Sequence, residues 1–441
     1  MKEEFTPQQE YVFNTVNNRD VHFLRLWFSD VFGNLKSLAI VPNELQRAFE
    51  IGIPIDGGLI YNVENELEQD IVIWPDATSF QILPWRPDEK CVARMFCNVK
   101  TPDGASFSSD TRHILQKTLE RASSLGYSIH IKPEIEFYYF VDSESPIPID
   151  EGSSFDLTTL DSASDLRRDT ILTLEAIGIP VEKSYHEAGP SQNEIDLRTQ
   201  DALSMADSIL SYKAAVKEIA RAHGVFASFM PKPLNDLPGS GMTLQIHLEN
   251  EKSSNVFYDE KKKDAYCLSK IGENFMAGIL KHAREFCLLT NQYSNSYKRL
   301  CSNGFCARTI AWSSQNKNTM LRLSTKRENC DSLSRIILRN PDPTCNPYLA
   351  FAGIIASGIQ GIEENLELSS PVEDFSKLNR DKENLPETLG EAIDEFEGSE
   401  LMRETLGDDV FNFIVKTKRS EWKEAISVVD NFEINQYLAV L

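Results

Sequence analysis

The sequence predicts an α+β protein with more than one domain, and three observations support this fold class. The chain has 441 residues, which is longer than one small hydrophobic core usually serves. Residues 131–140 alternate between side chains that suit solvent and side chains that suit a core, with the period of a β-strand. Residues 110–126 and 201–224 instead repeat apolar side chains at helical spacing, and each begins with an aspartate suited to capping, Asp110 and Asp201.

A turn signal divides the chain into two predicted domains. Residues 21–28 and 93–99 read as strands within an N-terminal part that mixes short helices and strands. The stretch Thr101-Pro102-Asp103-Gly104 then favours a turn. We therefore expect one domain over residues 1–103 and a larger one over residues 104–441.

Four glutamates are the first candidate functional residues. Glu134 and Glu136 lie two apart in the predicted strand, so their side chains point to the same face. Glu187 and Glu194 follow in the segment 186–196. An exposed strand face would explain the first pair by itself. Four carboxylates without nearby cysteine ligands favour a site for a hard cation, Mg²⁺ or Mn²⁺, rather than zinc.

Composition excludes several partners. The formal net charge is −22, which disfavours binding to nucleic acid and to anionic membranes. The eight cysteines form no Cys-x-x-Cys pair, so we expect free thiols and a cytoplasmic protein. The polar first residues indicate no signal peptide, and the most apolar run, residues 348–362, is too short to span a bilayer.

A basic segment runs against this acidic trend. Residues 295–340 contain nine basic and two acidic side chains. The basic ones are Lys298, Arg299, Arg308, Lys317, Arg322, Lys326, Arg327, Arg335 and Arg339. A solvated basic face is the simple explanation, but clustered arginines also suit carboxylates and phosphates. Together with the four glutamates, the segment indicates metal-assisted phosphoryl transfer.

Long, ordered motifs over nearly the whole chain resemble the class I glutamine synthetase family. They are Ile55-Asp56-Gly57-Gly58, Pro133-Glu134-Ile135-Glu136-Phe137, His186-Glu187 through Glu194-Ile195-Asp196, Phe229-Met230-Pro231-Lys232-Pro233, Gly239-Ser240-Gly241-Met242, Asn295-Ser296-Tyr297-Lys298-Arg299-Leu300, and Arg339-Asn340-Pro341-Asp342 leading to Asn346-Pro347-Tyr348-Leu349. The resemblance implies a small β-grasp-like N-terminal domain, a catalytic domain of antiparallel sheet and helices, and a homo-oligomer of two stacked six-membered rings. It also implies active sites between neighbouring subunits.

The resemblance further implies an ATP-dependent ligation of glutamate to ammonia through a γ-glutamyl phosphate, with two divalent metal ions. By position, Glu136, Glu187 and Glu194 match the ligands of the first metal. Of the arginines, Arg299 and Arg339 match those that hold glutamate, and Arg322 and Arg335 those near the transferred phosphate. Asp56 matches the aspartate that a neighbouring subunit supplies to help deprotonate ammonium. We also expect Gln245 and Lys317 to contact the ATP cofactor.

The second metal site departs from the family pattern. Its first ligand is present as Glu134, but the family's Gly-Ser-Gly-Met-His ends here in Thr243. The family's Arg-x-Glu-x-Arg carries Ile337 at the glutamate. One carboxylate is too little to hold Mg²⁺ unless ATP and water supply the remaining ligands. His247 lies on the same strand face as Thr243 and Gln245, and is either a displaced ligand or an ordinary histidine with a local partner, the latter being favoured.

Other departures concern the flap and regulation. The flap glutamate of the family aligns with Phe305, which removes a carboxylate and offers apolar surface to a larger amine. Cys301 and Cys306 flank the flap; two free thiols are the favoured interpretation over a redox pair or a soft-metal site. The loop 375–385 lacks a tyrosine for adenylylation, and the feedback arginine aligns with Asn65.

Two functions remain open from the sequence. The first is an ATP-dependent ligase that joins the γ-carboxylate of glutamate, or of a glutamate-like molecule, to ammonia or more readily to another amine. The second is a catalytically impaired homologue that keeps the fold, the oligomer, the glutamate site and the first metal for a regulatory or structural role. Thr243 and Ile337 stand where the family has second-metal ligands, and Phe305 stands where it has the flap carboxylate. These replacements predict weak or absent glutamine synthesis.

Overall fold

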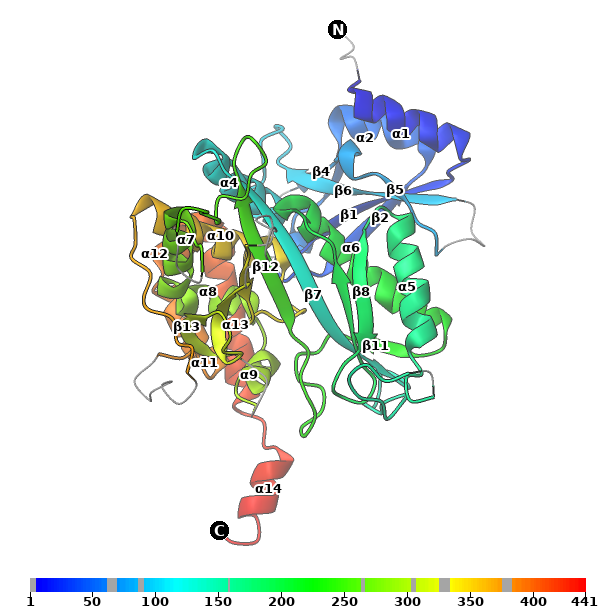
Figure 1. The fold of residues 1–441 in the computed structure, drawn as a ribbon. Helices are drawn as coiled ribbons and strands as arrows, with labels where there is room; N and C mark the ends of the chain where they lie inside the picture. The colour runs from blue at the N-terminus through cyan, green and yellow to red at the C-terminus, as the bar shows by residue number, and fades with distance from the viewer. Residues whose placement is uncertain are drawn as a thin grey trace.

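The computed structural model describes residues 5–61, 70–85, 91–157, 159–262, 266–302, 307–324, 334–374 and 383–441. In Figure 1 a smaller N-terminal domain, drawn in blue, sits at one end of a larger domain built around the long strands β7 and β12.

The N-terminal domain is a six-stranded sheet with helices against it. Its strands are β1 (Phe23–Ser29), β2 (Leu35–Ile40), β3 (Ile53–Asp56), β4 (Asp70–Pro75), β5 (Gln81–Ile82) and β6 (Val92–Lys100). The strand order is β2-β1-β6-β4-β3, with β5 paired to β6; β1 and β6 run parallel. The helices are α1 (Pro7–Asn18), α2 (Leu45–Ile51) and α3 (Gly58–Tyr61), with a 3₁₀ turn, η2, at Ala77–Ser79. The strands predicted near residues 21–28 and 93–99 are confirmed as β1 and β6.

The larger domain contains a nine-stranded sheet of order β13-β14-β15-β12-β7-β9-β8, with β10 and β11 paired to β7. The strands are β7 (Ser128–Phe140), β8 (Val181–His186), β9 (Gln192–Leu197), β10 (Gln200–Asp201), β11 (Phe226–Ser228), β12 (Met242–Glu249), β13 (Thr309–Ser313), β14 (Thr319–Leu323) and β15 (Ile336–Leu338). Neighbouring strands are antiparallel except β13 and β14, which are parallel. The predicted antiparallel sheet is therefore confirmed with one parallel pair added.

Eleven helices of the described residues accompany this sheet. They are α4 (Thr111–Ser124), α5 (Ser164–Ala176), α6 (Ala202–Ala222), α7 (Lys270–Lys281), α8 (Ala283–Thr290), α9 (Ser294–Leu300), α10 (Pro347–Glu363), α11 (Leu389–Glu397), α12 (Glu400–Leu406), α13 (Asp408–Ala425) and α14 (Asn431–Tyr437). The most apolar run of the sequence forms α10, which packs against α4, α6, α7 and α8. None of the helices in the described part of the chain is long and apolar enough to cross a membrane.

The alternation predicted for β7 separates a core face from a polar face. Ile135, Phe137 and Tyr139 are fully buried beneath α4 and α6, as expected from their odd positions. Glu134 and Glu136 project from the opposite face, and both are only partly buried. Burial of the odd positions fixes the orientation of the strand, because a shift by one residue would place the carboxylates in the core.

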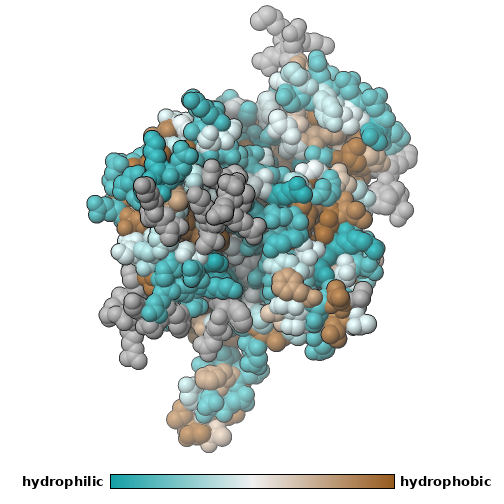
Figure 2. Space-filling model, viewed as in Figure 1, coloured by the Kyte–Doolittle hydropathy of each residue, from teal (hydrophilic) through white to brown (hydrophobic). Residues whose placement is uncertain are grey.

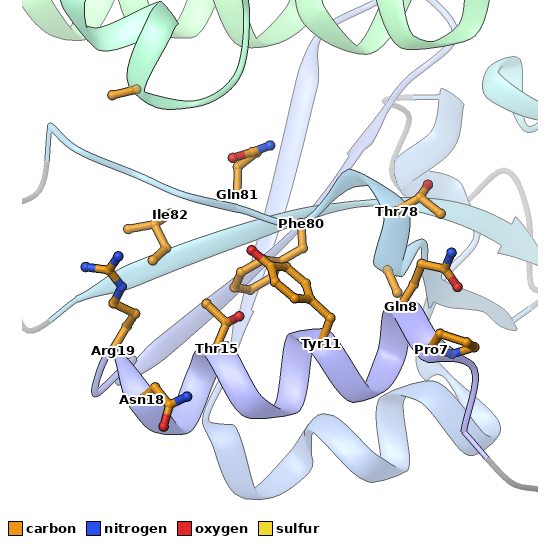
Figure 3. A pocket seen from close by; sticks show the side chains of 12 residues that line it. Pro7, Gln8, Tyr11, Thr15, Asn18, Arg19, Thr78, Phe80, Gln81 and Ile82 are labelled. Atoms are coloured by element: carbon orange, nitrogen blue, oxygen red, sulfur yellow. The ribbon is translucent and has the colours of Figure 1, made fainter.

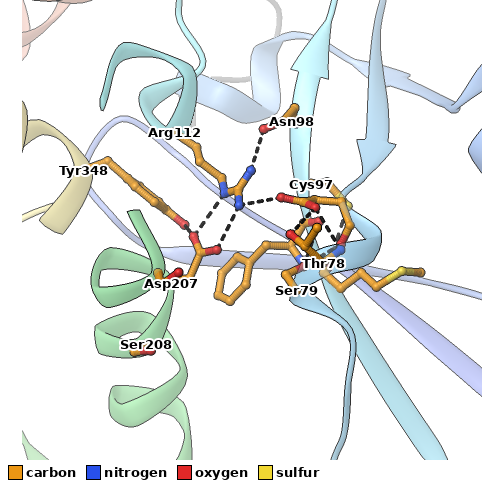
Figure 4. Close-up of polar contacts among 12 residues, drawn as sticks. Thr78, Ser79, Cys97, Asn98, Arg112, Asp207, Ser208 and Tyr348 are labelled. Carbon is orange, nitrogen blue, oxygen red and sulfur yellow. Dashed lines mark hydrogen bonds and ion pairs between the residues drawn. The ribbon is translucent and has the colours of Figure 1, made fainter. Parts of the chain in front are cut away.

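A buried polar network joins the two domains (Figure 4). Asp110 caps α4 by accepting from the backbone N–H of Arg112, as predicted. The Arg112 guanidinium then pairs with Asp76 at 2.8 Å and with Asp207 of α6 at 3.0 Å. Tyr348 of α10 donates to Asp207 at 2.6 Å. A charge with partners on both sides fixes the N-terminal domain against the helices that support β7, and its loss would leave buried carboxylates unpaired.

Candidate active site

A polar cleft of about 600 Å³ opens beside the carboxylates of β7. It is lined by Glu136, Ser154, Glu187, Ala188, Gln192, Lys232, Asn235, Asp236, Leu237, Pro238, Gly239, Gly241, Thr243, Arg299, Cys301, Ser302 and Arg339. Segments far apart in the sequence therefore meet in one place, and acidic and basic side chains face each other across it.

The polar face of the nine-stranded sheet is organised in rows of residues that pair directly across neighbouring strands. The first, the Glu136 row, consists of Tyr185, Glu194 and Glu136 on β8, β9 and β7. The second, the Glu134 row, consists of Lys183, Asp196, Glu134 and Thr243 on β8, β9, β7 and β12. The third, the Gln245 row, consists of Lys132, Gln245, Ile337 and Arg322 on β7, β12, β15 and β14. Successive rows share one face because side chains alternate along each strand.

The Glu136 row and Glu187 form a candidate metal site. Glu136, Glu187 and Glu194 bring one carboxylate oxygen each within 4.8 Å of one another. Burial and the charge of Glu187 raise the pKa of Glu136 to about 7. Burial, followed by the hydrogen bond and charge of Asp196, raises the pKa of Glu194 to about 10. Crowded carboxylates that resist ionisation together are what a divalent cation would relieve, and the all-oxygen donor set fits Mg²⁺ or Mn²⁺.

The loop that carries Glu187 is held from behind by Asp150. This carboxylate accepts from the backbone N–H of Ser191 at 2.7 Å and pairs with His186 at 3.0 Å. Ser191 adopts a left-handed backbone conformation with φ of 58°, which costs energy for a residue other than glycine. The strain at Ser191 is offset by contacts that fix the turn, so Glu187 is presented to the cleft by a preorganised loop.

Arg299 and Arg339 supply the positive side of the cleft. Arg299 is almost fully buried and donates to the backbone carbonyls of Asn340 and Pro341. The glycine at 241 permits this approach, because a Cβ there would lie 2.9 Å from the Arg299 guanidinium. Arg339 donates to the backbone carbonyl of Lys317. Both arginines line the same cleft as Glu136 and Glu187, and their binding of glutamate stays a prediction.

The Glu134 row lies one row beyond this cation site. Glu134 accepts a hydrogen bond from the Gln245 side chain at 2.5 Å. Burial and the neighbouring Asp196 raise the pKa of Glu134, while the ammonium groups of Lys132 and Lys183 oppose that rise. Partial burial lowers the pKa of Lys183, but the hydrogen bond and charge of Asp196 outweigh it, so the net pKa is raised. Glu134 thus sits among ammonium groups and an amide.

The Gln245 row gathers the predicted phosphate-binding residues. Arg335 donates to the Gln245 side-chain oxygen at 3.2 Å. Arg322 pairs in register with Ile337, and its guanidinium reaches the backbone carbonyl of Ser314 at 3.5 Å. Lys317, predicted to contact ATP, has an exposed side chain in the turn between β13 and β14. Its carbonyl positions Arg339, so the geometry gives this residue a supporting contact through its backbone.

His247 lies opposite His130, one row beyond Lys132 and Gln245. Its Nε2 atom lies 3.2 Å from a Glu249 oxygen, and its ring stacks on His130 with centroids 5.2 Å apart. Burial lowers the pKa of His247 to about 4 although Glu249 opposes this. A whole row separates His247 from Glu134, which favours a histidine with a local partner at Nε2 over a displaced ligand of the second metal; its buried Nδ1 makes no hydrogen bond to the described residues.

Several predicted residues lie elsewhere. Asp56 is at the exposed end of β3 and accepts from the Gly58 backbone N–H at 2.8 Å; it is absent from the described residues that line the cleft. Cys301 lines the cleft as a free thiol whose pKa is raised by burial. Phe305, Cys306 and Asn65 lie outside the described residues, as does most of the loop 375–385.

Sequence reasoning missed four side chains on these rows: Lys132, Lys183, Tyr185 and Asp196. Tyr185 donates to Glu194, and Lys183 pairs with Asp196 at 3.0 Å. Lys132 could have been found, because it alternates with Glu134 in the strand. Asp196 could likewise have been found, because it alternates with Glu194. Lys183 and Tyr185 depend on the register of β8, a short polar strand with a register shift between Val181 and Lys183, and the sequence pattern does not indicate that register.

A second hollow, of about 620 Å³, lies between α1 and the segment 77–82 of the N-terminal domain (Figure 3). Tyr11, Thr15 and Phe80 line its middle, and Arg19 stands at one end. None of its described lining residues is an acid, a histidine or a cysteine, so it offers no ligands for a metal ion.

The two-domain fold and the cleft of carboxylates and arginines place the chain in the glutamine synthetase class of folds. Family models match both parts: glutamine synthetase, beta-Grasp domain, over residues 20–102, and glutamine synthetase, catalytic domain, over residues 108–437. The chain belongs to the glutamine synthetase family. Whether the boundary falls at residue 103 stays a prediction.

Relatives and solved structures agree with this assignment over the full length. The chain is 42% identical to the glutamine synthetase of Mycolicibacterium smegmatis over 98% of this chain and 99% of that protein. It is 40% identical to the glutamine synthetase of Methanosarcina mazei over 98% of each. Among solved structures it is similar to ligand-free GmaS, with a TM-score of 0.88, 26% identity and coverage of 97% and 99%. A GmaS/ADP complex has a TM-score of 0.87 at 25% identity, with the same coverage.

The residues present fit one of the two metal ions that the family implies, but not the other. Glu136, Glu187 and Glu194 fit a divalent cation by number, chemistry and proximity. The second site does not fit as the family builds it, because Glu134 faces Thr243 across the strand pair and Ile337 supplies no oxygen. Glu134, Glu194 and Asp196 do bring one carboxylate oxygen each within 4.8 Å of one another, but the Lys183 ammonium already pairs with Asp196 at 3.0 Å. Burying a divalent cation beside an aliphatic side chain and lysine ammonium groups is unfavourable.

Proposed function

We propose that this protein binds glutamate, or a glutamate-like amino acid, beside one divalent cation, and that it is a poor catalyst of glutamine synthesis. The observation that carries the proposal is the division of one cleft into two halves. The Glu136 row, Glu187 and the arginines keep a donor set for a cation and an amino acid. The Glu134 row lacks the histidine and the second glutamate with which family members hold the second cation, and its Asp196 is paired with the Lys183 ammonium.

In the proposed complex, Arg299 and Arg339 bind carboxylate oxygens of the amino acid. Planar guanidinium groups suit this task because they donate two parallel hydrogen bonds to one carboxylate. Glu136, Glu187 and Glu194 would hold Mg²⁺ or Mn²⁺, which supplies positive charge next to the substrate carboxylate. The loop held by Asp150 keeps Glu187 oriented, so little ordering remains to be done on binding.

Glutamate binding tests this proposal directly. In the presence of Mn²⁺, we expect calorimetry to detect glutamate binding to the unaltered chain, and Arg339→Met to weaken it about 10–100-fold, the cost of a lost charged hydrogen bond. Arg308→Met is the matched control, because Arg308 pairs with Glu387 at 2.8 Å and does not line the cleft. No binding to the unaltered chain, or equal affinity in both variants, contradicts the proposal.

A second candidate function is ligation of the glutamate γ-carboxylate to an amine larger than ammonia, with ATP as phosphoryl donor. The similarity to GmaS, including its ADP complex, favours this candidate. The replacement of the flap glutamate by Phe305 also favours it, on sequence grounds. An ATPase screen with glutamate and a panel of primary amines distinguishes the two functions, because only the ligase gives amine-dependent phosphate release.

We also propose a homo-oligomer, in which a second copy covers the C-terminal segment. Residues 426–441, which include α14, project from the body (Figure 1), and apolar side chains are visible on this projection in Figure 2. Nine large apolar residues are exposed there: Ile426, Val428, Val429, Phe432, Ile434, Tyr437, Leu438, Val440 and Leu441. An exposed apolar arm of this kind favours association, and the family resemblance implies two stacked rings of six.

We expect sedimentation of the unaltered chain at micromolar concentration to show a large oligomer, near twelve subunits. Phe432→Asp with Leu438→Asp should shift it to smaller species, because charges on the arm oppose its burial. Leu172→Asp is a suitable control, since Leu172 is an exposed residue of α5, remote in sequence from the arm. A monomer in the unaltered chain, or the same distribution in both variants, argues against this assembly.

A further inference from the structure

Two residues at the second metal site differ from the metal ligands of the family, and the carboxylates beside them remain. Glu134 stands directly opposite Thr243, and Ile337 stands directly opposite Gln245. A methyl-bearing hydroxyl and an aliphatic side chain thus occupy positions where family members supply a histidine and a carboxylate. The Glu134 carboxylate and the adjoining Asp196 nevertheless remain, and buried carboxylates need a positive partner.

Lys183 supplies one positive partner. It lies directly opposite Asp196, which lies directly opposite Glu134, so the three side chains follow one another in a row. The Lys183 ammonium is 3.0 Å from an Asp196 oxygen, while the Asp196 side chain is fully buried. About half of the Lys183 side chain is exposed, so its stem can enter from the edge of the sheet without burying the whole residue.

Lys132 supplies the second positively charged group. It precedes Glu134 by two positions on β7 and therefore shares its face. Only 5% of its side chain is exposed, and its ammonium lies 2.9 Å from Glu182 of β8. A lysine is seldom buried to this degree unless its ammonium group is paired with a negative charge. The Lys132 ammonium therefore pairs with Glu182 and, from its place beside Glu134 on the same face, also opposes the rise that burial causes in the pKa of Glu134.

We infer that the ammonium groups of Lys183 and Lys132 replace the second divalent cation, so that the Glu134 row is neutralised from within the chain. This inference goes beyond the proposed function, because it concerns the half of the cleft that does not hold the amino acid. It predicts that restoring the two missing ligands alone will not restore a cation, since a metal ion would meet two fixed positive charges. The lysines must be removed as well.

Counting bound Mn²⁺ in four versions of the full chain tests the inference. Each version carries His247→Gln, because His130, His247 and Glu249 offer ligand atoms within 4.8 Å of one another and could take Mn²⁺ themselves. The first has no other change. The second adds Thr243→His and Ile337→Glu. The third further adds Lys132→Met and Lys183→Met. The fourth instead removes two exposed turn lysines, with Lys252→Met and Lys261→Met, from the second version.

We expect equilibrium dialysis to give the same number of bound ions for the first, second and fourth versions, and one more for the third. An extra ion in the second version shows that the lysines do not exclude the cation and overturns the inference. A third version that folds but binds no additional Mn²⁺ ion also overturns the inference. A first version with no ion refutes the proposed function, while the comparison between second and third versions still decides this inference.

Single substitutions test the same point if the third version fails to fold. In chelator, Lys183→Met should have a lower melting temperature than Lys183→Arg, which keeps the positive charge. Adding Mg²⁺ should raise the melting temperature of Lys183→Met by more than that of the unaltered chain, because an external cation can then enter the Glu134 row. If Mg²⁺ raises the melting temperature of the unaltered chain and of both variants by the same amount, the inference is overturned.

Discussion

Glutamine formation from glutamate, ammonia and ATP is expected to be at least about 10²–10³-fold slower than is usual for the family, which is the cost of removing one well-placed electrostatic contributor. Phosphoryl transfer relies on a cation that spans the β- and γ-phosphates and absorbs developing charge. Glu134 remains, but it faces Thr243, and Ile337 cannot bind a hydrated ion. Steady-state assay of glutamine at saturating Mg²⁺ measures the loss.

Restoring the ligands separates this explanation from a general loss of structure. Thr243→His with Ile337→Glu should give a larger gain than either change alone, because groups that act as one unit fail together. We expect the full gain only when Lys132→Met and Lys183→Met are added. Phe305 stays in all of these variants, so recovery should be partial.

Two results would contradict the expectation. Glutamine synthesis by the unaltered chain at a rate usual for the family would mean that another residue supplies the second cation. Full recovery by Ile337→Glu alone would mean that Thr243 and the lysines do not limit the reaction. Lys252→Met with Lys261→Met serves as the charge-matched control, since both lysines lie in an exposed turn.

The local pattern of the sequence predicted the part of the site that depends on one strand. Alternation along β7 placed Glu134 and Glu136 on the polar face and Ile135 in the core, because the period of a strand is two residues and the core face must be apolar. The predicted caps Asp110 and Asp201 are likewise confirmed, since capping involves neighbours only two or three residues apart.

Contacts between distant segments could not be predicted in the same way. The row that joins Lys183, Asp196 and Glu134 exists only after β8, β9 and β7 pair in one register, and β8 is too short and polar to indicate that register. The Arg112 network joins Asp76 and Asp207, which are 131 positions apart in the sequence and carry no local signal of their meeting. Family resemblance supplied the first-metal residues, but it could not supply lysines that depart from the family pattern.

The stability of the protein without metal should fall as the pH rises, because of the Glu136, Glu187 and Glu194 cluster. Burial and Glu187 raise the pKa of Glu136 from 4.5 to about 7, and burial and Asp196 raise that of Glu194 to about 10. A carboxyl whose pKa is raised by folding stabilises the folded state fully below pH 4.5, and this contribution is lost as the pH rises through the folded value. For Glu136 alone the loss is about 3 kcal/mol.

Added Mg²⁺ should reverse this trend, so the difference in melting temperature between Mg²⁺-loaded and chelated protein should widen from pH 6 to pH 8. Glu187→Gln removes one ligand and one source of repulsion. We expect it to weaken Mg²⁺ binding by at least the roughly 10–100-fold that loss of a supporting partner costs. The same variant should melt higher than the unaltered chain in chelator. Glu120→Gln, at an exposed position of α4, should change neither quantity. Identical melting with and without Mg²⁺ across this pH range would show that these carboxylates hold no cation.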